Sequence, residues 1–472
     1  MNHTTSLWRP YLHSATRSTR HSRRQFHLGD IHSAVPDAPS PTEIAPLLEE
    51  FAKHSPRPLT LPKLFSFGQP LTAESILESA SYVLSEAPRL FGSRVRNLEA
   101  LPFIVGMNPF IARILAAHRK SFKTIAMFPP VTSLEENTRV TAQLEALVQA
   151  HANDIPTMAK GFQECSRYMT PEEISEFLDS AIRNRIAVRL IAEQHIALSR
   201  ALQNGGKKVE EYIGVIHLAC SPKQMIRMCG SFVSELCEAT FGSAPKIIID
   251  GDVDSTFVYV PVHLEYILTE ILKNAFRASV ERHHKQGYSS RHPIPPIYIT
   301  ISPPGSETPI ASSAPSSSTA HPFISKHKQR PHFLSMRIRD EGGGVAESNI
   351  NKIFSYSFTT AGRNSVSASM DDIDFSGSGG GGGPYAAQHI GGMAALDGSY
   401  GGGGGGLFGE MVGRGVQVGT GTIAGLGYGL PMSRLYAKYF GGSLDFISLD
   451  GWGSDVFLKL RCLDDAEDVV IG

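Results

Sequence analysis

Apolar residues recur at helical spacing through the first half of the chain, from about residue 72 to residue 202. One helix is expected over 133–150, where leucines and Val140 form the apolar side. Another is expected to begin at Thr170, because a proline follows it directly and a glutamate three residues later completes a capping box. Several long helices with short connections predict an antiparallel helical bundle, which we place at residues 71–220.

The pattern changes after residue 220. Helices are expected at about 222–240 and from Val262 to about Arg282. Short apolar runs typical of strands lie at Lys246–Ile249, Phe257–Val260, Ile297–Ile301, Leu334–Ile338, Phe446–Ser448 and Asp455–Leu460. This alternation predicts an α/β domain at residues 221–464, with a mixed sheet and its helices on one face.

Three segments lack such periodicity. Residues 31–70 are rich in proline and serine and are expected to form an extended lead-in. Residues 302–332 are dense in serine, proline and threonine, and glycine dominates residues 361–420. Neither of the latter two can bury enough apolar surface to offset its ordering entropy, so both are expected to be disordered insertions.

Composition narrows the class of protein. The chain has 472 residues, 41% of them apolar, and a net charge of -1, which indicates a globular protein without the basic face of a nucleic-acid binder. No apolar run is long enough for a membrane span. The five cysteines include no CxxC pair, which favours buried thiols over zinc or disulfide frameworks. Residues 1–30 contain arginine and serine but no acidic residue before Asp30, which is typical of a mitochondrial transit peptide; a disordered basic tail is the alternative.

The expected helix around residues 264–278 carries the first candidate chemistry. Its apolar residues fall on one broad arc, which is expected to face the sheet. Glu270, Lys273, Asn274 and Arg277 fall on a separate stripe. Considered alone, this stripe is more typical of the solvated face of an amphipathic helix than of a site.

Two glycine motifs change that interpretation. Asp340 ends a predicted strand and is followed by Gly342 and Gly344; the carboxylate can accept from an exocyclic amine such as that of adenine, and the glycines allow a flat ring to approach. The run 425–431, Gly-Leu-Gly-Tyr-Gly-Leu-Pro, opens a predicted helix whose free N–H groups suit phosphate oxygens. Either motif alone could be a tight turn. Together with the stripe, and with Phe358-Thr359-Thr360 between them, they predict a nucleotide site.

The order of Glu-x-x-Lys-Asn at 270–274, Asp-x-Gly-Gly-Gly at 340–344 and Gly-x-Gly-x-Gly-Leu-Pro at 425–431 resembles the GHKL superfamily of ATP-binding domains. Further runs at 101–109, 358–361 and 433–444 resemble the mitochondrial α-keto acid dehydrogenase kinases, and the likeness covers about residues 60–463 apart from the two insertions. Tyr266 stands where the pyruvate branch of that family has a histidine, and the C-terminal Asp-Trp pair of that branch is not found. The branched-chain branch is therefore the most similar.

The resemblance implies a fold and a set of roles. The fold is α+β with two domains, an N-terminal antiparallel helical bundle followed by a GHKL (Bergerat-type) α/β sandwich. Asn274 would hold Mg²⁺, Glu270 would act as the base, Asp340 would bind adenine, and Gly342 and Gly344 would let the base pack. Lys273 and Arg277 would offset phosphate charge, and Thr359 and Thr360 would contact nucleotide. The phosphates would lie on Gly425, Leu426, Gly427, Tyr428, Gly429 and Leu430, which would also hinge a lid over 361–424. Ser454 and Asp455 could lie near the nucleotide or form a structural turn.

The implied activity is that of an ATP-dependent protein-serine kinase of the mitochondrial matrix. It would phosphorylate and inactivate the dehydrogenase component of an α-keto acid dehydrogenase complex, with the branched-chain complex favoured over the pyruvate complex. ATP and Mg²⁺ are the implied cofactors, and K⁺ is a further ion that the resemblance admits. The bundle would dock on the lipoyl-bearing acyltransferase core, and the kinase would be a homodimer. His118 and His195, on bundle helices, are expected to be structural or to face a partner.

Three other functions were weighed. A GHKL histidine kinase would carry a phospho-accepting histidine followed by Asp or Glu, and none of the 18 histidines has such a neighbour. A conformational ATPase of the same superfamily would need transducer and dimerisation domains after the ATP domain. A pseudokinase that only binds its complex is disfavoured because Glu270 and Asn274 are both present.

Overall fold

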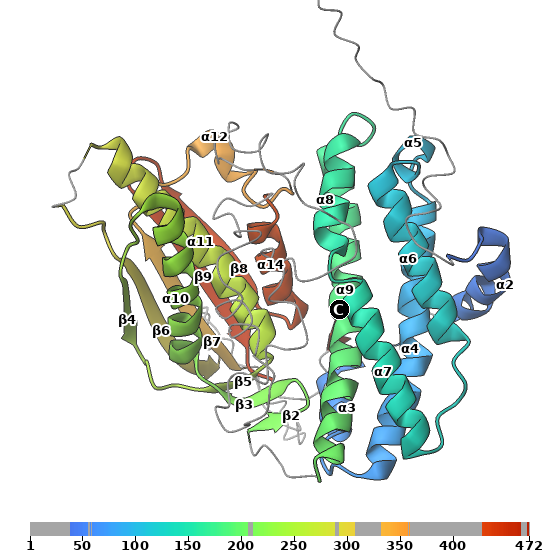
Figure 1. Cartoon of the computed structure of the whole chain (residues 1–472). Coiled ribbons are helices and arrows are strands. Elements are labelled where there is room, and N and C mark those ends of the chain that lie inside the picture. Colours follow the sequence, from blue (N-terminus) through green and yellow to red (C-terminus); the bar gives the residue numbers. More distant parts are fainter. Residues whose placement is uncertain are drawn as a thin grey trace, which may run out of the picture.

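The computed structural model describes residues 38–54, 57, 59–205, 211–287, 292–306, 332–356, 358, 427–463 and 470–471. The expected transit peptide and the glycine-dominated segment 361–420 lie outside these residues. Figure 1 shows a helical domain standing beside an α/β domain. This arrangement confirms the predicted fold class at the level of a helical domain followed by an α/β domain. No helix among the described residues is long and apolar enough to cross a membrane.

The helical domain consists of long helices packed along one another (Figure 1). Its elements are α2 (Pro41–Ala52), β1 (Leu59–Thr60), α3 (Leu61–Ser66), α4 (Ala73–Glu99), α5 (Phe103–Gly106), α6 (Pro109–Ala126), α7 (Leu134–Ala150), α8 (Asp154–Glu164) and α9 (Pro171–Gln203). Helix α4 contacts α6, α7 and α9, and α6 also contacts α8. The core of this domain therefore lies around α4, where Val83, Phe91 and Val95 are buried.

The predicted helix starts are confirmed. Thr170 precedes α9, and its Oγ1 accepts from the backbone N–H of Glu173 at 3.2 Å. The Glu173 carboxylate accepts in turn from the backbone N–H of Thr170 at 2.7 Å. Ser133 and Glu136 form the same capping box before α7. Each box satisfies backbone donors that a helix start otherwise leaves unpaired.

The expected boundaries of this domain were wrong at both ends. Residues 31–70 include α2 and α3 and so do not form an extended lead-in; Ser40 caps α2, and Ile44 and Leu48 bury one side of it. At the other end the last bundle helix stops at Gln203, at the break Asn204-Gly205-Gly206 where the sequence indicates an end to the helices. The residues that follow, up to 220, were assigned to this domain but include β2 (Tyr212–Ile213) and β3 (Ile216–Cys220), which join a small sheet with β5. Strands this short contain too few residues for an alternation of apolar and polar positions to be recognised in the sequence.

The α/β domain is built on a five-stranded sheet. Its elements are α10 (Pro222–Phe241), β4 (Ile247–Gly251), β5 (Phe257–Tyr259), α11 (Pro261–Lys285), β6 (Ile297–Ser306), β7 (His332–Asp340), α12 (Glu347–Ile350), α14 (Gly429–Tyr439), β8 (Ser443–Leu449) and β9 (Gly453–Arg461). The strand order is β4-β6-β7-β9-β8. Only β4 and β6 pair in parallel, so the sheet is mixed, as predicted. The strand β10 (Val470–Ile471) pairs with β1 of the other domain.

Two strand predictions need correction. Phe257–Val260 was assigned to the main sheet, but β5 belongs to the three-stranded sheet β2-β3-β5. The expected insertion at 302–332 is shorter, because Ser302 pairs with Ser335 and Ser306 with His332. Backbone hydrogen bonds extend this hairpin beyond its apolar residues, so polarity alone placed the strand ends too early.

Helices α10, α11 and α14 cover one face of the five-stranded sheet (Figure 1). The inward residues of the strands, such as Ile299, Ile338 and Leu458, are buried beneath them. The two domains meet where α14 packs against α9. Tyr356 adds a link, since its hydroxyl donates to Asp179 of α9 at 2.5 Å. His195 is fully buried in the helical domain, where Ser79 lies 3.0 Å from its Nδ1, so its role is structural.

Candidate functional site

Helix α11 holds the first set of predicted site residues. Its apolar arc, which includes Leu264, Ile267 and Leu268, is buried as expected. The polar stripe is not a solvated face, because Glu270 and Lys273 are only 7% and 3% exposed. The Lys273 ammonium donates to Glu270 Oε1 at 2.6 Å. Burial without a partner would be costly for either group, so the two charges stabilise each other beside the cavity.

A cavity of ≈ 520 Å³ lies over the polar side of α11. Glu270, Asn274 and Arg277 line it from α11, Asp340 from the end of β7, and Gly429 from the start of α14. The three motifs, separated by up to 160 residues of chain, thus converge on one space of the size that cofactor sites usually have. Asn274 is exposed, unlike its neighbours on the helix, and its amide is open to a ligand.

Asp340 is a buried carboxyl group at the end of β7. It is 8% exposed, and its Oδ1 accepts from the backbone N–H of Gly342 at 2.8 Å. Burial raises the pKa of Asp340 to about 6, against the lowering effect of hydrogen bonds from the backbone of Gly342 and Ser454. A further N–H donor inside the cavity would favour the charged carboxylate. Asp340 is therefore suited to accept from an amine of a bound base.

The glycines after Asp340 are required by close packing. A Cβ at Gly342 would overlap the Ala278 side chain, and Gly344 has a positive φ of 72° with the Leu449 carbonyl against it. Arg282 fixes this loop from α11: its guanidinium donates to the carbonyls of Glu341, Trp452 and Gly451, the last at 2.9 Å. The sequence motifs do not single out Arg282, although its position two helical turns after Asn274 could have indicated it.

The second glycine motif lies against Glu270 of α11 and lines the same cavity as the first. Gly427 has a positive φ of 79°, and α14 begins at Gly429 without a side-chain cap. A Cβ at Gly429 would overlap Glu270 Oε2, so the first turn of α14 is in contact with Glu270. The N–H groups of Gly429 and Leu430, at the uncapped start of this 11-residue helix, belong to residues that line the cavity and are a favourable place for phosphate oxygens.

Several predicted residues lie elsewhere. Tyr428 does not line the cavity; its ring is buried and packs on Tyr356 with centroids 5.1 Å apart. Asp455 lies on the opposite face of the sheet, where it binds Arg337 at 2.8 Å, while Ser454 lines the cavity. This follows from the alternation of side chains along β9. Thr359, Thr360, Gly425 and Leu426 fall outside the described residues.

The cavity also has an apolar part that the sequence analysis did not identify. Ile338, Val456 and Phe446 line it from three strands of the sheet, and Phe358 lines it as well. The strand residues occupy inward positions of β7, β9 and β8. Alternation marked them as core, but their position at the end of the helix layer, facing a cavity, depends on the tertiary structure. An apolar patch beside Asp340 suits a flat heterocycle.

Comparison with known proteins finds similarity to mitochondrial kinases. A family model described as mitochondrial branched-chain alpha-ketoacid dehydrogenase kinase matches residues 58–217. The mitochondrial pyruvate dehydrogenase (acetyl-transferring) kinase of Arabidopsis thaliana is 29% identical over 87% of this chain and 92% of its own length. The corresponding kinase 1 of Saccharomyces cerevisiae is 25% identical over 88% and 86%. Isozyme 4 of Homo sapiens is 26% identical over 88% of this chain and 84% of its own length.

Proposed function

We infer that the chain belongs to the mitochondrial α-keto acid dehydrogenase kinase family and is a mitochondrial ATP-dependent protein kinase whose site is the cavity over α11. Its substrate is a serine of the dehydrogenase component of an α-keto acid dehydrogenase complex. The observation that carries this proposal is the convergence of Glu270, Asn274, Asp340 and the start of α14 on one cavity. The α/β domain is accordingly a GHKL-type ATP domain.

We assign each residue a role that its surroundings support. Asp340 accepts from the adenine amine, and the apolar strand residues pack on the ring. The N–H groups at the start of α14 bind the phosphates, and Arg277 at the cavity wall offsets their charge. The exposed amide oxygen of Asn274 fits Mg²⁺, which prefers oxygen ligands and, when bound, neutralises charge on the phosphates. K⁺ has no site among these residues that we can assign.

Glu270 accepts the proton of the substrate serine in this scheme. Its Oε1 accepts a hydrogen bond from the Lys273 ammonium, which places a positive charge beside the carboxylate. Its Oε2 faces Gly429. This places Glu270 between the metal ligand Asn274, one turn further along α11, and the phosphate-binding turn of α14. A serine hydroxyl entering there would meet the base and the terminal phosphate together. Lys273 lines the cavity but is almost fully buried and donates to Glu270, so in this scheme it orients that carboxylate as well as offsetting phosphate charge.

The branched-chain complex is the favoured substrate. Tyr266 is buried one turn before Glu270, and its hydroxyl lies 3.5 Å from Met432 Sδ of α14. It thus packs behind the site, where the pyruvate branch has a histidine. The pyruvate complex is the second candidate, because the relatives above are named as pyruvate dehydrogenase kinases.

The kinase docks through its helical domain on the lipoyl-bearing acyltransferase core. At one end of that domain α5 exposes two large apolar side chains, Phe103 (79%) and Ile104 (53%), which suit a contact with a lipoyl group or its domain. We also propose a homodimer. The face of the five-stranded sheet opposite the helices exposes apolar side chains that a partner copy would bury: Ile248, Tyr298, Ile447, Leu449 and Phe457.

The deciding experiment uses purified pyruvate and branched-chain dehydrogenase complexes with the full-length kinase and labelled ATP. Serine phosphorylation and loss of dehydrogenase activity are followed together. We expect phosphorylation of the branched-chain complex, and none of either complex by the Asn274→Ala variant. Phosphorylation of the pyruvate complex alone would reverse the substrate assignment, and wild-type chain inactive on both complexes would refute the proposed function.

A further inference from the structure

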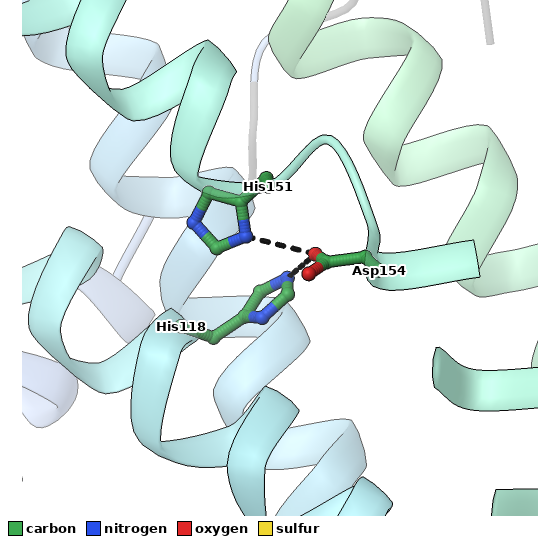
Figure 2. Close-up of side chains that lie close together, drawn as sticks. All are labelled: His118, His151 and Asp154. Atoms are coloured by element: carbon green, nitrogen blue, oxygen red, sulfur yellow. Dashed lines mark hydrogen bonds and ion pairs between the residues drawn. The ribbon is translucent and has the colours of Figure 1, made fainter. Parts of the chain in front are cut away.

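Three side chains with metal-binding atoms meet inside the helical domain, in the domain that does not hold the ATP cavity. They are His118 on α6, His151 directly after α7 and Asp154 at the start of α8 (Figure 2). One ligand atom of each lies within 4.8 Å of the others, and all three residues are buried. The segments they join are brought together only by the packing of α6, α7 and α8.

The distances are close to those of a bound metal. Asp154 Oδ2 lies 2.8 Å from His151 Nδ1 and 3.7 Å from His118 Nε2, and both nitrogens point toward it (Figure 2). Atoms that share one tetrahedral Zn²⁺ at bond lengths near 2.1 Å lie about 3.4 Å apart. To reach that spacing, the Asp154–His151 contact would open by about 0.6 Å and the Asp154–His118 contact would close by about 0.3 Å. The two histidine nitrogens, which lie within 4.8 Å of each other, would adjust by side-chain rotation.

The hydrogen bond of His118 decides which of its ring nitrogens is available to a metal. Its Nδ1 lies 2.9 Å from the Ile114 carbonyl, which can only accept, so Nδ1 carries a proton. The other nitrogen of the neutral ring, Nε2, then holds a lone pair, and it faces Asp154 Oδ2 at 3.7 Å. A cation between the imidazole lone pair and the carboxylate oxygen would be coordinated by both.

The surroundings resemble the outer shell of a metal site. Ser121 Oγ lies 2.7 Å from His151 Nε2, and the Ile114 carbonyl fixes His118. Ligating histidines usually have such a partner on the other ring nitrogen. Two buried arginines act against a cation here: Arg185 donates to the His151 carbonyl at 2.6 Å, and Arg94 lies close enough to affect Asp154. The single carboxylate offsets part of their charge, so we expect a site of moderate affinity.

We propose that His118 Nε2, His151 Nδ1 and Asp154 Oδ2 bind one Zn²⁺, with the fourth position left for water. On binding, the proton of His151 Nδ1 moves to Nε2, which then donates to Ser121 Oγ; the histidine stays neutral and no proton is released overall. The metal fastens the α7–α8 turn onto α6. It is separate from the Mg²⁺ position at Asn274, which lies in the other domain and uses an amide oxygen.

The test uses the full-length chain freed of metal with a chelator, in the presence of excess Mg²⁺ and ATP so that the nucleotide site is filled. Zn²⁺ content after dialysis is measured by mass spectrometry, and affinity by competition with a chromophoric chelator. Co²⁺ serves as a spectroscopic probe of coordination. We expect one Zn²⁺ per chain, a tetrahedral Co²⁺ spectrum without a thiolate band, and a Tm that rises with Zn²⁺.

Variants locate the site. His118→Gln should weaken Zn²⁺ binding by at least 100-fold and remove the Tm increase, whereas His195→Gln, at another buried histidine of the same domain, should leave both unchanged. Ser121→Ala keeps all ligands and should cost about 10–100-fold in affinity, so the proposal stays testable if His118→Gln does not fold. Absence of stoichiometric binding by the wild type, a cobalt–thiolate band, or equal affinity in wild type, His118→Gln and Ser121→Ala would each overturn the assignment.

Discussion

At the scale of single residues, the site depends on a few side chains whose burial differs sharply along one helix. Asn274 is exposed to the cavity, while Glu270 and Lys273 beside it are buried as an ion pair. The sequence placed all three on one stripe, and this was correct. It did not distinguish the ligand-facing amide from the paired charges, because that distinction depends on how α14 covers the helix.

Asn274→Ala should abolish Mg-ATP binding, because it removes the Mg²⁺ ligand proposed for the nucleotide site while leaving the Glu270–Lys273 ion pair intact. The measurement is titration of Mg-ATP by calorimetry, with the thermal unfolding of the apoprotein as the check on folding. An unchanged affinity for Mg-ATP would refute the metal assignment.

Glu270→Gln should retain ATP binding and lower kcat by about 10²–10⁴-fold, the usual contribution of a general base. Single-turnover phosphorylation of the dehydrogenase complex measures the chemical step directly. The matched control is Glu281→Gln, on the same helix and also at the cavity wall, where its carboxylate pairs with Arg277 at 3.0 Å. Parallel loss of binding and turnover in Glu270→Gln would leave the base role without support.

The raised pKa of Asp340 predicts that both the stability of the apoprotein and its affinity for ATP depend on pH. This pKa of about 6 lies above that of an unfolded aspartate, so the folded state binds more protons between about pH 4 and 6. Stability of the apoprotein should therefore fall as pH rises through that window, by roughly 3 kcal/mol at most, and stay lower above it. Asp340→Asn should remove this dependence and weaken ATP binding. The affinity of the wild type for ATP should increase from pH 5 to pH 7, because the adenine amine donates to the ionised carboxylate and not to the protonated acid. Denaturant titrations at several pH values provide the stability, and a flat profile would contradict the assignment.

At the scale of elements, the position of one helix start decides the shape of the site. Helix α14 begins against Glu270, and the loop after β7 is fixed by Arg282 from α11. The glycine motifs predicted both turns from the sequence. Their contact with α11 could not be predicted from local pattern, because it depends on how α14 and the loop pack across a distance in sequence.

Gly429→Ala should disturb catalysis more than folding. The added Cβ would overlap Glu270 Oε2, so the carboxylate must move away from its present position. A displacement of about 1 Å commonly costs on the order of 10²-fold in rate. Gly106→Ala is the control, since an added Cβ there meets nothing within 4 Å. In the Glu270→Gln background the Gly429→Ala change should add little; a full further loss would mean that it acts through something other than Glu270.

At the scale of the whole molecule, the exposed face of the five-stranded sheet is the feature that the helices leave uncovered. Sheets with one solvated face usually alternate apolar and polar residues, yet here the outer positions include Tyr298, Ile447 and Phe457. Arg337 and Arg339 both pair with Asp455 between them. An apolar surface around a charged centre is suited to a self-complementary contact.

Ile447→Lys combined with Phe457→Lys should convert the proposed dimer into a monomer, because the interface would then bury two lysine charges without an acidic partner. Sedimentation velocity over a range of concentrations measures the shift. The control is Phe103→Lys combined with Ile104→Lys on α5, which should leave the dimer intact and weaken binding to the acyltransferase core instead. A wild-type chain that sediments as a monomer, or a double sheet variant that remains dimeric, would contradict the proposed interface.

The sequence by itself determined the helical first domain, the α/β second domain and the three motifs of the nucleotide site. These features depend on local rules, since periodicity, capping boxes and glycine turns are set by neighbouring residues. Predictions from the sequence were wrong where strands pair over long distances in the chain. β5 belongs to a second sheet, and β6 and β7 extend past their apolar residues. Asp455, adjacent to a cavity residue, proved to face the other way.

Only the tertiary structure decided that the polar stripe of α11 lines a cavity, that Glu270 is shared between Lys273 and the start of α14, and that His118 meets His151 and Asp154. The reason is common to all three. Each depends on the distance between side chains on different elements, and packing alone fixes that distance. A sequence specifies which groups are available, whereas their charge state and chemistry follow from burial and from the neighbours that the fold supplies.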